Sequence, residues 1–109
     1  MIDQILSAAQ INHRQGRFVR EPEGTYAVYF DDIEVETVDR VPGIAGAPRI
    51  LHHTARVELY EQKPDPAAEA ALEAELDARG LPWTKEDRYW LDDVQRYQVL
   101  YETNYTEKS

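Results

Sequence analysis

The side chains best suited to chemistry are three histidines and two pairs of neighbouring aspartates. His52 and His53 are adjacent, so on a β-strand they point to opposite faces and cannot bind one metal ion together. His13 could join one of them with Asp31 or Asp32, but the chain has no HxH, HxxxH or HExxH spacing of the kind that metal sites use. We therefore expect neither a metal site nor a cofactor.

The aspartate pairs at 31–32 and 92–93 could serve general acid–base chemistry. Both pairs lie between strand-like segments, where aspartate is favoured because it hydrogen-bonds to the backbone of a turn. The five glycines form no phosphate-binding loop, and the only serines are Ser7 and Ser109. We expect a protein that is not an enzyme. The enzymatic alternative, a small hydrolase or metal-dependent enzyme, would require a bound metal.

Composition limits the remaining classes. The chain has 109 residues, with 12 Lys and Arg against 21 Asp and Glu, a formal net charge of −9. That length predicts one domain over 1–109, and the absence of cysteine excludes disulfides and thiolate metal sites. No apolar run is long enough to cross a membrane, so we expect no membrane partner. The negative charge disfavours sequence-independent nucleic-acid binding, because phosphates would be repelled.

The N-terminal half predicts a helix, a hairpin and a loop. Ile2, Ile5, Leu6 and Ala9 share one face of a helix over about 2–13. Two strands follow at about 25–31 and 33–39, and the pair 31–32 between them indicates the turn of a hairpin. The Pro- and Gly-rich segment 41–48 is a loop and is unusual in being apolar.

The C-terminal half predicts a strand over about 50–61, a helix over about 66–79 and strands over about 83–91 and 95–106. Asp65 is a good N-cap of the helix, and Gly80 suits its C-terminal end. Glu69, Glu73 and Asp77 form an acidic stripe on this helix, turned away from its apolar side. These elements predict an α+β fold, a single two-layer domain whose mostly antiparallel sheet of about four to five strands carries two helices.

The seven tyrosines and two tryptophans exceed what one buried sheet face can hold. Both faces of several strands carry aromatic residues, so some stay exposed in a monomer. Exposed aromatic patches mark protein interfaces. Together with the apolar loop 41–48, they predict an oligomeric or partner interface, and the candidates are Tyr29, Ile44, Tyr60, Trp90 and Tyr101.

Several segments resemble the small tail-completion or head–tail joining proteins of tailed phages and prophages. The similarity runs over about residues 20–108 and rests on the order of the elements and on the VELY (57–60), KEDRYW (85–90) and YQVLYET (97–103) segments. The resemblance implies an α+β virion protein that forms a homo-oligomeric ring, which could be hexameric, at the head-proximal end of the tail. Its implied partners are the tail-tube protein and the head connector, and it would reside in the virion neck after assembly in the host cytoplasm.

Such a ring could let DNA pass without binding it specifically, because an acidic lining repels phosphate. The stripe Glu69, Glu73 and Asp77, or the aspartate pairs, could supply that lining, although a plain solvated helix face explains the stripe equally well. The alternative function is an acidic regulatory or inhibitory protein-binding module of phage origin, one that imitates DNA or docks on a basic host protein. The net charge of −9 motivates this alternative.

Overall fold

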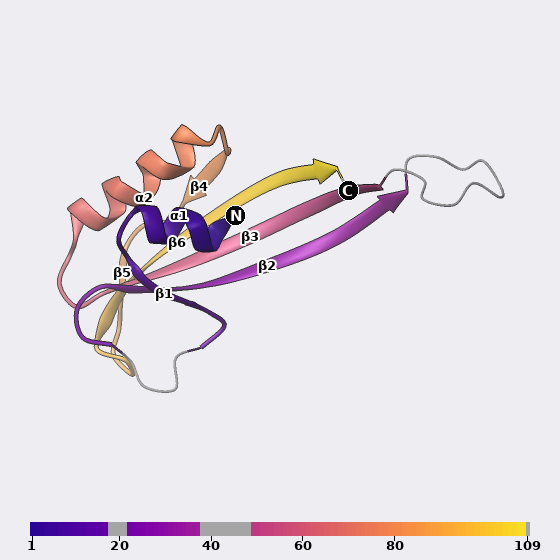
Figure 1. Cartoon of the computed structure of the whole chain (residues 1–109). Helices are drawn as coiled ribbons and strands as arrows, with labels where there is room; N and C mark the ends of the chain where they lie inside the picture. The colour runs from indigo at the N-terminus through magenta and orange to yellow at the C-terminus, as the bar shows by residue number, and fades with distance from the viewer. Residues whose placement is uncertain (18–21, 38–48, 109) are drawn as a thin grey trace.

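The computed structural model describes residues 1–17, 22–37 and 49–108 and confirms the α+β class. Two helices lie on one face of a sheet that is mostly antiparallel (Figure 1). The helices are α1 (Ile2–Ala8) and α2 (Pro66–Ala78), and the strands are β1 (Asn12–Gln15), β2 (Tyr26–Thr37), β3 (Arg49–Glu61), β4 (Trp83–Lys85), β5 (Tyr89–Leu91) and β6 (Arg96–Lys108). The sheet thus has six strands within the described residues, slightly more than expected.

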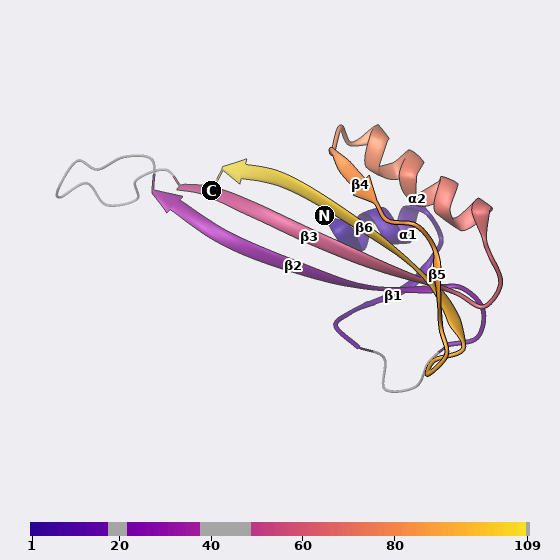
Figure 2. The ribbon, with the colours of Figure 1, turned by 180° about the vertical axis from the view of Figure 1, so that it is seen from behind.

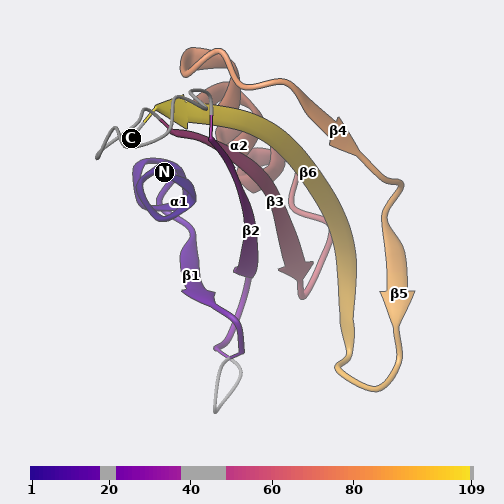
Figure 3. The same ribbon diagram turned by 90° about the vertical axis from the view of Figure 1, so that its right-hand side faces the viewer.

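The strand order is β1-β2-β3-β6-β4, and β5 also pairs with β6. Only β1 and β2 are parallel, and the other pairs are antiparallel. The centre of the sheet is a long register in which Tyr29 pairs with Val57 and Val57 pairs with Tyr101. Seen from the side, the sheet curves from β1, next to α1, to β5 at the opposite edge (Figure 3).

The helices cover the sheet face that carries the alternating apolar residues. Ile5, Leu6, Leu72 and Leu76 are 0–1% exposed and pack on that face. The sheet contributes the other half of the core: Ala27, Ala55, Val57, Leu59, Val99 and Tyr101. We call this the helix face and the opposite side the open face. No helix in the described part of the chain is long and apolar enough to cross a membrane.

Two boundaries in the N-terminal half were wrong. The helix ends at Ala8 rather than near 13, because Gln10 adopts a left-handed conformation (φ 59°) and Ile11 N–H donates to the Leu6 carbonyl, which closes the helix end. Residues 12–15 form β1 instead. Within the described residues the expected hairpin is a single strand, β2, because Asp31 and Asp32 continue its alternation and pair with Ala55 and Thr54.

The C-terminal half follows the sequence prediction more closely. Helix α2 begins after Asp65, whose Oδ1 accepts a hydrogen bond from Ala68 N–H at 3.1 Å, and it ends before Gly80, which has the left-handed φ of +66°. The strand expected at 83–91 is two short strands, β4 and β5. They are separate because the chain leaves the sheet at residues 86–88, where Arg88 turns towards β3 and α2.

Three strands are longer than the helices that cover them. Strands β2, β3 and β6 have 12, 13 and 13 residues, about 40 Å at the usual rise, whereas α1 and α2 are about 10 and 20 Å long. Their far ends therefore extend beyond both helices (Figures 1 and 2). We call residues 31–37, 49–54 and 104–108 the arm. It makes the molecule elongated, with extents of 56 × 29 × 22 Å.

Asp65 should be a strong determinant of stability, because it caps α2 and also accepts a hydrogen bond from Thr25 Oγ1 at 2.6 Å. We expect Asp65→Ala to lower the free energy of unfolding by about 1–2 kcal/mol in urea titrations. Asp65→Asn keeps a capping oxygen and should lose less than half as much. Equal stability of the alanine variant and the wild type would contradict this role.

Candidate functional site

Five charged residues form an ionic cluster between α2, β3 and the segment 82–92. Arg88 Nε donates to Glu61 Oε1 at 2.8 Å, and Arg88 also pairs with Glu69. Lys85 Nζ lies 2.9 Å from Glu69 Oε1 and 2.8 Å from Glu73 Oε2. The cluster therefore attaches the loosely paired segment of β4 and β5 to the body of the domain.

Glu61 is the most deeply placed member, because its side chain is fully buried at the end of β3. Burial, together with a hydrogen bond to Glu69, raises the pKa of Glu61 to about 7 although Arg88 lowers it. Glu61 Oε2 has no N–H or O–H donor among the described residues. A proton on Glu61 gives this oxygen a partner, because a protonated carboxyl can donate to Glu69.

Glu69 behaves in the opposite way. Burial alone would raise its pKa, but hydrogen bonds from Glu61, Lys85 and Arg88 lower it to about 2. The two carboxyl groups therefore favour holding one proton between them near neutral pH, with the charge on Glu69. A carboxyl with a raised pKa can act as a general acid. Here a substrate would reach Glu61 only if the segment 82–92 moved away, so in this conformation the pair has a structural role.

The acidic stripe predicted on the second helix is not a free acidic surface. Glu69 is 5% exposed, and both Glu69 and Glu73 are paired with Lys85. Asp77 is exposed, and its Oδ1 accepts a hydrogen bond from Trp83 Nε1 at 2.8 Å. The sequence prediction failed because the partners, Lys85 and Arg88, approach the helix only after the turn at residues 79–82.

A second titratable group lies at the base of the arm. His53 is 6% exposed, with Nδ1 3.0 Å from both Asp31 carboxylate oxygens and Nε2 2.9 Å from Glu107 Oε1. Its ring stacks on Tyr105 at 4.3 Å. Burial lowers the pKa of His53, but the hydrogen bonds to Asp31 and Glu107 outweigh burial and raise it. His53 thus joins the three strands of the arm, and His52 points to the open face.

The predicted interface residues are dispersed. Tyr101 is 1% exposed in the core, where its hydroxyl donates to Glu73 Oε2 at 2.7 Å, so Tyr101 is not a surface residue. Tyr29 is half-buried and packs against the core. Tyr60 faces the other way and stacks on Tyr26 with a centroid distance of 5.1 Å. Ile44 and the rest of the loop 41–48 lie outside the described residues.

Trp90 is the one described candidate that is well exposed, at 44%, and it contacts Tyr97 edge-on at 4.9 Å. Its neighbour Tyr89 is 43% exposed on the opposite face of the same short strand, and we call this aromatic edge of the sheet, Tyr89 and Trp90, the β5 patch. Sequence reasoning missed a second patch. Ile33 and Val35 are 52% and 57% exposed on the helix face of the arm, and we call them the arm patch. The signal for the arm patch was that the strands are longer than the helices that cover them.

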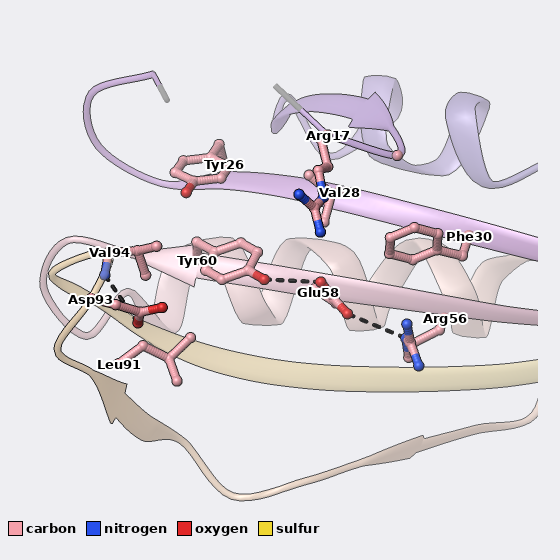
Figure 4. A pocket seen from close by; sticks show the side chains of 11 residues that line it. Arg17, Tyr26, Val28, Phe30, Arg56, Glu58, Tyr60, Leu91, Asp93 and Val94 are labelled. Carbon is pink, nitrogen blue, oxygen red and sulfur yellow. Dashed lines mark hydrogen bonds and ion pairs between the residues drawn. The ribbon is translucent and has the colours of Figure 1, made fainter. Parts of the chain in front are cut away.

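The open face carries a pocket of about 580 Å³ (Figure 4). Its floor is the open face of β2 and β3, and its walls are the turn at 91–94 and the end of β1. Arg17 reaches into it from above β2. Arg56 lies 5.0 Å from the Phe30 ring centroid and pairs with Glu58. The lining residues are Gly16, Arg17, Tyr26, Val28, Phe30, Arg56, Glu58, Tyr60, Leu91, Asp93 and Val94.

Comparison with protein-family models and with curated protein sequences found no match for this chain. The described residues include no group of three or more His, Asp or Glu side chains placed to hold a metal ion. The geometry thus offers three surfaces for association, namely the arm patch, the β5 patch and the pocket, and two buried charge clusters that hold the fold.

The ionic cluster predicts a specific pH dependence. The pKa of Glu61 is about 7 in the folded protein and returns to its ordinary 4.5 on unfolding. The folded state therefore binds this proton more tightly, so the stabilisation from Glu61 is complete below about pH 4.5 and is lost as the pH rises towards 7. The side chain of Glu61→Gln stays neutral at every pH. The unfolding free energy of this variant minus that of the wild type should therefore rise between pH 5 and pH 8.

Urea titrations at several pH values measure this difference, which isolates Glu61 from the other titrating groups, His53 included. Glu75→Gln is the matched control, because Glu75 forms a solvated i, i+4 pair with Arg79 at 2.6 Å. We expect its curve to run parallel to that of the wild type. A Glu61→Gln curve that is also parallel would contradict the proposed proton on Glu61.

Proposed function

We propose that this chain is a structural subunit of a phage or prophage neck, acting in head–tail joining or tail completion as a homo-oligomeric ring. The observation that carries the proposal is the presence of two unlike apolar patches at opposite ends of the long axis. Ile33 and Val35 lie on the arm, whereas Tyr89 and Trp90 lie beside β6 at the far end (Figure 1). Exposed apolar clusters of this kind mark association surfaces.

The placement of the patches favours a ring over a two-fold dimer. A two-fold interface uses one surface that is complementary to itself, and this chain has two surfaces of different character. A contact between unlike surfaces repeats from copy to copy and closes into a ring when the rotation permits. The resemblance to tail-completion proteins supports the biological setting, in which the ring contacts the tail tube on one side and the head connector on the other.

The charge distribution suits a ring that surrounds DNA without binding it. A net charge of −9 repels phosphates, so DNA would pass rather than adhere. The alternative, an acidic module that imitates DNA, gains less support. Glu69 and Glu73, two of the three residues of the expected acidic stripe, are paired with cations of the chain, Lys85 and Arg88.

The assembly is testable with a charge placed on the arm patch. We expect the wild type to form a discrete oligomer by native mass spectrometry and sedimentation, and Val35→Asp to weaken association at least tenfold, because a carboxylate would be buried at the contact. Thr106→Asp adds the same charge to an exposed position on the open face of the arm and should have a much smaller effect. A wild type that stays monomeric at high concentration and at all salt concentrations would contradict a self-assembling ring.

The biological role has its own test. Deletion of the gene from the phage or prophage that encodes it should leave filled heads and separate tails in electron micrographs of lysates. Complementation with the wild type should restore joined virions, and complementation with Val35→Asp should not. Normal virions after deletion would refute the role in joining. Co-purification of a basic host protein, with no virion components, would favour the regulatory alternative.

A further inference from the structure

The pocket is surrounded by cations that have no counter-ion in the described chain. Of the Arg and Lys side chains that the structure describes, Arg56, Arg79, Lys85 and Arg88 are ion-paired, whereas four are not: Arg14, Arg17, Lys63 and Arg96. Arg17 lines the pocket, and Arg14 is the register partner of Val28 on its floor. The Arg96 guanidinium lies 5.9 Å from the ring centroid of Tyr26, another lining residue. In a chain of charge −9, three of these four cations gather at one pocket.

The arm has the complementary properties. Residues 31–37, 49–54 and 104–108 contain five carboxylates and two cationic residues, a net charge of −3. One face of the arm presents Ile33 and Val35 to solvent. The pocket offers apolar and aromatic surface for these side chains, including Val28, Phe30 and Val94, and its charged lining consists of Arg17, Asp93 and the Arg56–Glu58 pair.

We propose that the arm of one copy of this chain docks in the pocket of the next copy. The arm patch would pack on the apolar floor and on Val94, and the net negative charge of the arm would be attracted to the unpaired cations Arg14 and Arg17. The proposal rests on the ring proposed above and specifies its contact: the arm patch meets the pocket, which Leu91 of β5 lines, and not Tyr89 or Trp90 themselves. It assigns two surfaces of one chain to each other and therefore needs no second protein.

The two surfaces cannot meet within one molecule. Phe30 lines the pocket, and the arm begins at Asp31 on the same continuous strand, so β2 leads away from the pocket rather than back into it (Figures 1 and 4). A contact between them is therefore between copies and is heterologous, which is the geometry that a ring requires. Opposite charge would steer the encounter and set the register.

The absence of cysteine makes this contact measurable by disulfide formation between engineered residues. We expect the double variant Val35→Cys/Val94→Cys to give, on mild oxidation, a ladder of covalent oligomers ending at a closed ring. An equimolar mixture of the two single variants should give only covalent dimers containing one chain of each kind. Each single variant alone should give little covalent product.

The control is Glu34→Cys/Val94→Cys, which places the arm thiol one residue away, on the opposite face of β2. It should cross-link at least fivefold less. Efficient dimers of Val35→Cys alone would show that arms meet arms and would overturn the proposal. If native mass spectrometry finds a ring but the double variant does not cross-link, the docking is refuted and the proposed function stands. A strict monomer refutes both.

Charge reversal gives a second readout with a matched control. Arg17→Glu should weaken association about tenfold, because it opposes the acidic arm with a like charge. Lys63→Glu makes the same change at the other unpaired cation, which lies in the segment between β3 and α2, away from the pocket. It should alter association less than twofold. Equal losses in both variants would show that only the total charge matters, and would overturn the docking.

Discussion

The difference in length between strands and helices is the constraint on which the rest of this structure depends. Two helices of 7 and 13 residues can cover only part of strands that have 12 and 13 residues. The covered part is a conventional core, in which the central side chains are almost completely buried. The uncovered part keeps the same alternation, so its apolar residues, Ile33 and Val35, face water. The arm is therefore a continuation of the core pattern without a second layer.

The ionic cluster attaches a weakly paired segment to the body of the domain. Strands β4 and β5 have three residues each, too few to hold the segment 82–92 through the sheet alone. Arg88 joins it to both Glu61 on β3 and Glu69 on α2. The three carboxyls of the cluster face two cations, which leaves an excess of negative charge, and a shared proton relieves it. The stability of this edge of the sheet is thus tied to protonation.

The sequence predicted the parts of the fold that depend on local signals. Asp65 and Gly80 mark the ends of α2 correctly, and the α+β class follows from the order of elements. The prediction failed where the type of a residue is compatible with two different local structures. Asp31 and Asp32 suit a turn, yet they lie within a strand because both pair with β3, and His53, 22 residues away, binds Asp31. Similarly, the position of Glu69 in the sequence fits a solvated stripe, but in the fold Glu69 pairs with Arg88. The pocket could not be predicted, because its walls come from residues 16–17 and 91–94, which only the tertiary fold brings together.

One edge of the arm also affects the tendency of the protein to aggregate. Strand β1 pairs with Tyr26–Tyr29 only, so within the described residues the outer edge of β2 beyond Tyr29 has no neighbouring strand. Such an edge is a template for indefinite strand addition. Here it carries four carboxylates within six residues, Asp31, Asp32, Glu34 and Glu36, and their mutual repulsion discourages edge-to-edge growth. The same acidic residues that give the arm its charge thus also disfavour the growth of fibrils.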